Sequence, residues 1–379
     1  MTDQFNNEFN LDDDVIYLNH AAVAPWPVRT EKAVNAFCRE NVTIGSKKYA
    51  NWLNVEAHLK NQLAQLIQAD NADEIALVKN TSEALSFVAY GLDWAHGDTI
   101  VTSDEEFPSN MIPWESLENQ GVRVIKTHLK DTEDPTAELI KNIDSRTKLL
   151  TISSVQYASG LRVDLERLGE ACQQRGVLFC IDAIQSVGAF PIDVKKYQAD
   201  FVMADGHKWM LGPEGLGFFY CRQSSINTLK LTQYGWHMVE DMGNYDALEW
   251  STAKSARRFE CGSPNMLSIH ALSASLSLLL EVGMNTVANN LIERGQYVID
   301  KVQQSPSLTL LTKPDAQGNN IIVFKPTKHD TNELFDYLTS QQVVCAKRGG
   351  GIRFSPHFYT PFSIIDRAFT LINRFLTDT

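Results

Sequence analysis

The 379-residue sequence has few of the features that mark a membrane, secreted or nucleic-acid-binding protein. It has no basic excess: the net charge is −12, whereas nucleic acid and anionic membranes favour basic surfaces. Residues 1–14 lack the basic flank and apolar core of a secretion signal, and the most apolar helical stretch, residues 271–280, is too short to span a bilayer. We therefore expect a cytoplasmic protein with a small-molecule partner, and neither a nucleic-acid nor a membrane partner.

The sequence also lacks paired cysteines. Its six cysteines are scattered, no Cys-x-x-Cys occurs, and several lie in apolar runs, where a reduced thiol behaves as a small hydrophobic side chain. The histidines His237, His270 and His357 show no spacing typical of metal ligands. These absences predict reduced thiols, no structural zinc and no other metal site.

The composition is ordinary for a globular protein, with 44% hydrophobic and 21% charged residues, and the length favours two domains. From residue 75 to residue 204, short apolar runs alternate with helical segments, a pattern typical of a mainly parallel sheet covered by helices on both faces. The runs that we expect to be strands are Ile75–Val78, Thr99–Thr102, Val122–Ile125, Leu149–Ser153, Val177–Ile181, Phe201–Ala204 and Gly215–Cys221.

Helical periodicity is expected over residues 29–68, from Leu267 through Asn289, and again near Leu291–Gln303. Beyond residue 263 the pattern changes to that of a separate α+β domain, with further strands at Leu308–Leu311 and Asn320–Phe324 and a last helix at Pro361–Leu376. We therefore divide the chain into an N-terminal segment (1–28) that joins the small domain, a large domain (29–262) and a small C-terminal domain (263–379).

An acidic and a basic residue follow two neighbouring apolar runs. Asp182 comes at the end of the run that begins at Gly176, and Lys208 follows the run Phe201–Ala204. Both are expected at the carboxyl ends of parallel strands, where open α/β sheets bind their ligands. A lysine that can hold an aldehyde as a Schiff base and a carboxylate that can keep a ring nitrogen protonated are the two groups that a pyridoxal phosphate site needs.

Further motifs occur in an order that resembles one family, the class V aminotransferases, which are fold type I pyridoxal-phosphate enzymes and include cysteine desulfurases, kynureninase and isopenicillin N epimerase. The motifs extend over nearly the whole chain and are Tyr17–Ala22, the pair His207-Lys208, Arg258–Asn265 and Ile352–Tyr359. The resemblance implies an α/β fold with a large, mainly parallel sheet of the seven-stranded type, a smaller α+β C-terminal domain, and pyridoxal 5′-phosphate as cofactor.

The resemblance also implies roles for residues at the cofactor. Lys208 and Asp182 are expected to be catalytic. The other expected cofactor contacts are Thr81 and Ser82 at the phosphate, Phe107 stacked on the ring, Gln185 at the phenolic oxygen, His207, and Ser263 reaching the phosphate of a neighbouring subunit's cofactor in a homodimer. On the sequence alone, Thr81 and Ser82 suit a helix cap without a ligand equally well, and Phe107 suits ordinary core. Asp205 stands where the family commonly has a serine, and a carboxylate cannot donate to a phosphate, so we leave it out of the contacts.

The expected substrate is an amino acid, with a 2-oxo acid as a second substrate if the enzyme transaminates. Arg353 matches the arginine that grips a substrate α-carboxylate through a bidentate pair. Asn19, His20 and Tyr157 are the other expected substrate contacts, and either Gln156 or Tyr157 could contact the cofactor. Specificity for the substrate side chain is expected to involve His20 and Tyr157 together with Tyr234 and Trp236.

Three functions fit these residues. We favour an enzyme of the aminotransferase type, with epimerases and lyases sharing the same residues. A cysteine desulfurase or selenocysteine lyase is the alternative; it needs a reactive thiol over the cofactor, and the nearest cysteine to Arg353, Cys345, lies in an apolar run where a thiol is inert. A non-catalytic protein with this fold is the least favoured, because Lys208 and Asp182 are both present.

Overall fold

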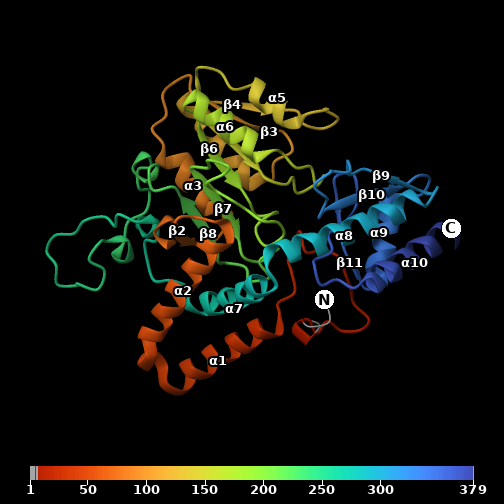
Figure 1. The fold of residues 1–379 in the computed structure, drawn as a ribbon, viewed down its shortest axis with the longest axis horizontal. Coiled ribbons are helices and arrows are strands. Elements are labelled where there is room, and N and C mark those ends of the chain that lie inside the picture. Colours follow the sequence, from red (N-terminus) through yellow and green to blue (C-terminus); the bar gives the residue numbers. More distant parts are fainter. Residues whose placement is uncertain (1–4, 6, 379) are drawn as a thin grey trace.

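A seven-stranded sheet forms the centre of the structure, a computed structural model that describes residues 5 and 7–378 (Figure 1). In the order in which they lie side by side, its strands are β2 (Ile75–Val78), β8 (Gly217–Cys221), β7 (Phe201–Asp205), β6 (Leu178–Asp182), β5 (Thr147–Ser153), β3 (Thr99–Ser103) and β4 (Arg123–Thr127). The strands from β7 to β4 run parallel, and only β8 runs antiparallel to its neighbours β2 and β7. The expected large, mainly parallel sheet is confirmed.

Helices cover both faces of this sheet. Along β6, Phe179 and Ile181 join the core on one face while Cys180, between them, joins the core on the other, as the two-residue period of a strand requires. Buried side chains of α2 (Tyr49–Ile67), α6 (Leu165–Arg175) and α7 (Met266–Val282) complete the first core. The second is completed by α3 (Thr81–Gly91) and by Trp114 of the short α4 (Ile112–Glu115). Burial on both faces explains why these strands read as continuous apolar runs.

Glycines interrupt two stretches that read as helical. The expected helical region at residues 29–68 forms α1 (Val28–Ile44) and α2, with Gly45 between them at a φ of 57°. The helix expected from Leu267 through Asn289 ends at Gly283, whose φ of 82° is left-handed, and α8 (Met284–Gln303) starts there in a new direction. No single described helix is long and apolar enough to cross a membrane; α7 and α8 reach that length only together, across a bend of 84°.

The C-terminal part of the chain lies beside the large sheet and has a smaller core of its own (Figure 1). Its four-stranded antiparallel sheet consists of β12 (Ala346–Arg348), β13 (Gly351–Phe354), β10 (Ile322–Pro326) and β9 (Leu308–Leu310), packed with α8, α9 (Thr331–Ser340) and α10 (Phe362–Asp378). Near the N-terminus, β1 (Ile16–Tyr17) pairs in parallel with β11 (Val343–Val344) of this part. The domain division after residue 262 stays a prediction; α7, which lies beyond it, packs on α1 and α2 with the large sheet.

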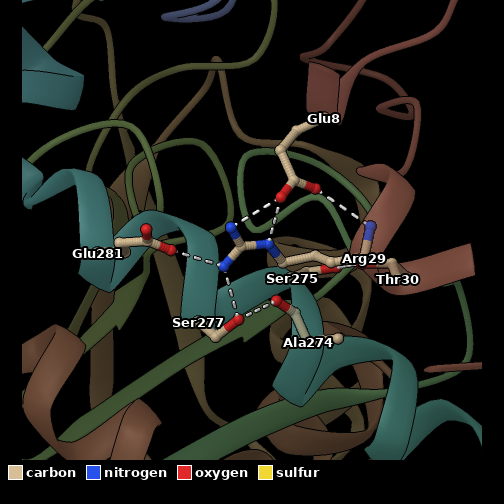
Figure 2. Close-up of polar contacts among 7 residues, drawn as sticks. All are labelled: Glu8, Arg29, Thr30, Ala274, Ser275, Ser277 and Glu281. Atoms are coloured by element: carbon tan, nitrogen blue, oxygen red, sulfur yellow. Dashed lines mark hydrogen bonds and ion pairs between the residues drawn. The ribbon is translucent and has the colours of Figure 1, made fainter. Parts of the chain in front are cut away.

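Arg29 ties the N-terminal segment to α1 and α7 (Figure 2). Its guanidinium lies 2.8 Å from Glu8 and 2.9 Å from Glu281, near the end of α7, and donates to Ser277 Oγ at 3.0 Å. Glu8 also accepts from the backbone N–H of Arg29, in the first turn of α1. One side chain therefore holds the segment that leads into β1 against α1 and α7.

A buried ion-pair cluster joins α2 to the segment before α7. Lys60 lies 3.2 Å from Glu56 and 2.8 Å from Glu260, and Glu260 also accepts from the backbone N–H of Leu77 on β2. Glu56, His237 and Glu260 offer ligand atoms within 4.8 Å of one another, as a metal site would, but the ammonium of Lys60 is the cation between the two carboxylates. Burial lowers the pKa of Lys60, but the two carboxylates outweigh this effect and raise it overall.

We predict that Lys60→Met lowers the stability of the protein by about 3–5 kcal/mol, because it leaves two buried carboxylates without their cation. Lys79→Met is the matched control: Lys79 also pairs with a glutamate, Glu83, but its side chain is 75% exposed. The control should cost less than about 1 kcal/mol. Urea unfolding of the two variants side by side measures the difference, and equal losses of stability would contradict the buried-cluster interpretation.

Candidate active site

A cleft of about 300 Å³ opens at the carboxyl ends of β6 and β7. Its walls come from the start of α3, from the segments that follow β3 and β5, and from the hairpin of β12 and β13 in the smaller domain. The expected site residues that line this cleft are Thr81, Ser82, Phe107, Tyr157, Asp182, Gln185, His207, Lys208 and Arg353. Most of the residues predicted for one site therefore come together, from segments far apart in the sequence.

Asp182, which is buried, and Lys208, which is half-buried, place opposite charges in this cleft. Asp182 ends β6, where Oδ1 accepts from the backbone N–H of Ile184 at 3.0 Å. Burial raises the pKa of Asp182 to about 7, helped by the nearby carboxylate of Glu106 and opposed by Lys208. Burial also lowers the pKa of Lys208 to about 8, against the attraction of Asp182 and with the repulsion of Arg353. The amine is therefore neutral at a lower pH than an ordinary lysine, which favours nucleophilic attack.

The N-terminus of α3 supplies an anion-binding end to the cleft. Asn80 caps this helix by accepting from the backbone N–H of Glu83, and Thr81 and Ser82 start it. The hydroxyl of Thr81 is buried and has no hydrogen-bond partner among the described residues, while Ser82 Oγ donates to Ser109 Oγ. A buried, unsatisfied hydroxyl at a helix N-terminus fits a phosphate, whose oxygen would accept a hydrogen bond from it.

Phe107 lies at the cleft surface rather than in the core. Its side chain is 42% exposed, and the Nζ atom of Lys208 lies 5.7 Å from its ring centroid. The ring of Tyr157 packs edge-on against it, with 5.1 Å between the centroids. A ring that packs against Tyr157 and is open toward Lys208 can stack on a planar cofactor.

The amide of Gln185 is oriented by two buried contacts. Its Nε2 donates to the backbone carbonyl of Ala21, and its Oε1 accepts from the indole N–H of Trp209, which follows Lys208 directly. The second N–H of the amide remains available for an acceptor in the cleft, such as a phenolic oxygen. The loop after β1 and the segment that carries the lysine are thus connected through one side chain.

Arg353 is a buried cation without a carboxylate partner among the described residues. Arg353 lies on β13 and is only 3% exposed. Its Nη1 donates to the carbonyl of Tyr157 at 2.7 Å, and its Nη2 lies 3.4 Å from Asn19 Oδ1. Its Nε has no acceptor in the described part of the chain. Burial and, to a smaller extent, the neighbouring Arg348 lower the pKa of Arg353 to about 10. Such a guanidinium fits the carboxylate of a substrate.

Asn19, His20 and Ser263 do not line the cleft. Tyr234 and Trp236, which were expected to contribute to specificity, line a separate pocket.

His20 is fully buried outside the cleft lining; its Nδ1 contacts the carbonyl of Ser355 and its Nε2 contacts the hydroxyl of Tyr359. Burial lowers the pKa of His20 to about 4, so it is a neutral ring with both nitrogens engaged. We therefore no longer propose it as a substrate contact. Ser263 is exposed and likewise does not line the cleft of its own chain.

Glu106 is a site residue that the sequence reasoning missed. Its carboxylate accepts from the backbone N–H and hydroxyl of Ser153, from Asn110 and from Gln156 Nε2. Burial raises its pKa, although these donors oppose the effect. Gln156 is thereby turned into the protein, whereas Tyr157 lines the cleft, which favours Tyr157 of the two alternatives. The sequence did contain a signal for this contact: Glu106 follows β3 and Gln156 follows β5, and the carboxyl ends of these neighbouring parallel strands lie side by side.

These residues fit pyridoxal phosphate. The cleft combines a partly neutral lysine, a buried carboxylate with an elevated pKa that a cation would lower, and an unsatisfied hydroxyl at a helix N-terminus. Lys208 would hold the aldehyde, Asp182 would face the ring nitrogen, and Thr81 and Ser82 would face the phosphate.

The chain is similar to known proteins along nearly its whole length. The family described as "Aminotransferase class-V" matches residues 16–356. A probable cysteine desulfurase of Methanothermobacter thermautotrophicus is 28% identical, over 94% of each chain, and the uncharacterized aminotransferase YcbU of Bacillus subtilis is 30% identical, over 82% of each. The crystal structure of the cysteine desulfurase CsdA (S-sulfonic acid) from Escherichia coli matches with a TM-score of 0.88, at 22% identity, over 99% of this chain and 98% of that one.

We predict that the rate at which the protein captures pyridoxal rises with pH up to about 8 and is level above it, because the neutral amine of Lys208 is the attacking form. An ordinary lysine, with a pKa near 10.4, would give a rate that still rises tenfold per unit at pH 9. Stopped-flow absorbance measures the rate, and Lys208→Ala supplies the background from surface lysines. A rate that continues to rise through pH 10 would show that Lys208 is not the activated amine.

Proposed function

The chain belongs to the class-V aminotransferase family, whose cofactor is pyridoxal phosphate, and we propose that within it this enzyme cleaves the carbon–sulfur bond of a cysteine-type amino acid. The observation that carries the amino-acid part of the proposal is Arg353, a buried guanidinium with no carboxylate partner among the described residues, in the same cleft as the half-buried Lys208. The sulfur-containing substrate is inferred from relatives named cysteine desulfurases, one of which is similar over 94% of this chain. They favour the desulfurase alternative over the aminotransferase that we first expected.

The residues of the cleft divide the chemistry among them. When bound, pyridoxal phosphate supplies an electron sink for the bonds broken next to the substrate nitrogen. Arg353 holds the substrate carboxylate, and Lys208 Nζ, with its lowered pKa, can take up and return a proton near neutral pH. The carboxylate of Asp182 keeps a positive charge at the ring nitrogen, and the exposed face of Phe107 limits the tilt of the ring. These roles remain proposals for each residue.

A desulfurase needs a reactive thiol over the cofactor to accept the sulfur, and this chain has none in the cleft. None of its six cysteines lines the cleft. Cys345, the nearest in sequence to Arg353, is only 9% exposed and packs in the core of the smaller domain, where burial raises the pKa of the thiol to about 12. A thiol in that position is a poor nucleophile. We therefore propose that the sulfur is not passed to a thiol of the chain.

Without a chain thiol as acceptor, the sulfur leaves as sulfide. Cysteine loses its α-proton, and its Cβ–Sγ bond breaks with the electron pair leaving on the sulfur. Water then replaces the amino nitrogen on Cα of the remaining three-carbon skeleton. Cysteine and water thus become pyruvate, ammonia and hydrogen sulfide, with no oxidant or reductant required. The second candidate is transamination to a 2-oxo acid; it is favoured by the same buried position of Cys345 and by the similarity to YcbU.

We predict that the enzyme releases sulfide, pyruvate and ammonia in equal amounts from L-cysteine, and that Cys345→Ser retains at least about the order of magnitude of turnover, because that thiol is buried away from the cleft. Colorimetric assays of the three products measure this, with Lys208→Ala as the inactive control. Loss of sulfide release in Cys345→Ser would restore a thiol acceptor. Transfer of the amino group to a 2-oxo acid without sulfide release would make the enzyme an aminotransferase.

We also propose that the enzyme works as a homodimer in which each chain completes the other's site. Ser263 is exposed and lies outside its own cleft, as expected of a residue that reaches the cofactor of a second copy. The loop at residues 229–255, which extends away from the large sheet as a green segment in Figure 1, carries exposed large side chains, among them Tyr234, Tyr245, Leu248 and Trp250. Leu248 is fully exposed, and an apolar group of this size favours burial against another chain.

We predict that mixing Lys208→Ala chains with Ser263→Ala chains restores activity. Each hybrid dimer has one site that contains both intact residues, so random exchange should recover about a quarter of the wild-type sites. The control mixture, Ser263→Ala with a chain that carries both changes, has the same number of chains with Lys208 but no Ser263, so it should keep only the activity of Ser263→Ala sites. A monomer by light scattering, or equal activity of the two mixtures, would contradict the shared site.

A further inference from the structure

Trp209 follows Lys208 directly and is fully buried. Its side chain packs in a small core to which the segments after β5 and β6 and the strand β10 contribute, among them Val155, Phe190 and Val323. The backbone is packed as closely, because a Cβ atom at residue 188 would lie 2.3 Å from the carbonyl oxygen of Trp209. The residue after the expected Schiff-base lysine is therefore fixed where the large sheet meets the C-terminal part of the chain.

His357, in the segment after β13, holds Trp209 from the C-terminal part. Its Nδ1 accepts from the backbone N–H of Phe358 at 2.8 Å, so the proton of the neutral ring lies on Nε2, which donates to the carbonyl of Trp209 at 3.1 Å. Burial lowers the pKa of His357 well below its usual value, so the ring stays neutral. The two rings also pack together, with 5.3 Å between their centroids. Both the backbone and the indole ring of Trp209 are thus held in one position.

Trp209 in turn determines which way the amide of Gln185 points. An indole N–H can only donate, so the atom that faces it at 2.8 Å is Oε1 of Gln185. The carbonyl of Ala21 can only accept, so it faces Nε2 at 3.0 Å. The last torsion of a glutamine side chain is broad, and these two hydrogen bonds are what fixes it here. Gln185 lines the cleft, and the second N–H of Nε2 is the donor that it can still offer there.

We propose that Trp209 is a positioning residue, whose indole N–H holds the amide of Gln185 so that its free N–H faces the phenolic oxygen of the cofactor. The inference rests on the proposed function, in which the cofactor is bound on Lys208 in this cleft. Phenylalanine at position 209 would keep an aromatic ring in the core but would leave Oε1 of Gln185 as a buried acceptor without its donor. The amide would then be free to rotate, and its contact with the phenolic oxygen would weaken, although Lys208 and Asp182 are unchanged.

Equilibrium dialysis of the apo-protein with pyridoxal phosphate and, separately, with 3-deoxypyridoxal phosphate, which lacks the phenolic hydroxyl, tests the proposal. The ratio of the dissociation constant of the analogue to that of pyridoxal phosphate isolates the contact with the phenolic oxygen. Trp209→Phe should lower this ratio about threefold to tenfold, as expected for the loss of one hydrogen bond. Trp52→Phe is the matched control, because Trp52 is also buried and donates its indole N–H to Glu40 Oε1, but lies on α2 outside the cleft. It should leave the ratio unchanged.

A double-mutant cycle shows whether Trp209 acts through Gln185. Gln185→Leu should lower the ratio by itself, and adding Trp209→Phe should lower it no further. A further fall in the double variant would overturn the proposal, and so would an equal loss of affinity for both ligands in Trp209→Phe, which would leave Trp209 a packing role only.

If Trp209→Phe does not fold, benzothienylalanine at position 209 keeps the shape of the indole and replaces its N–H by sulfur. It should lower the ratio to the same extent, and an unchanged ratio would likewise overturn the proposal. Failure of pyridoxal phosphate itself to bind Lys208 would instead contradict the proposed function.

Discussion

The site depends on two opposite charges that the fold buries at the edge of one sheet. Asp182 and Lys208 follow adjacent strands, β6 and β7, whose parallel pairing brings their carboxyl ends together. Burial moves both pKa values toward neutrality, the carboxyl up to about 7 and the amine down to about 8. Burial therefore disfavours the charged form of each group. A ligand that places a positive charge beside Asp182 would stabilise its carboxylate. The two dense cores on either side of the sheet hold this arrangement in place.

The smaller domain contributes a buried guanidinium to the cleft. Arg353 belongs to β13, between Ile352 and Phe354, both of which are fully buried in the core of that domain. Its guanidinium nevertheless reaches the cleft of the large domain, where Tyr157 and Asn19 orient it. Because β1 pairs with β11, the segment that carries Asn19 is itself attached to the smaller domain. A movement between the two parts of the chain would therefore carry Arg353 and Asn19 together relative to the large sheet.

Much of the fold and of the site could be predicted from the sequence, for reasons that differ between residues. The strands were predictable because burial on both faces leaves uninterrupted apolar runs, and Lys208 because a motif surrounds it. The break at Gly283 was not, because helical periodicity continues on both sides of a single glycine. The buried position of His20 and the network of Glu106 depend on contacts between segments far apart in the chain, which no local pattern records. The identity of the substrate likewise depends on such contacts, so the sequence alone does not predict it.

The most direct measurement of the central claim is to incubate the protein with pyridoxal phosphate, reduce it with borohydride and map the modified peptide by mass spectrometry. The account predicts one stoichiometric modification, on Lys208, the lysine that lines the cleft and whose pKa burial lowers to about 8. Modification of another lysine, such as the exposed Lys79 just before the start of α3, or no stoichiometric modification at all, would contradict it.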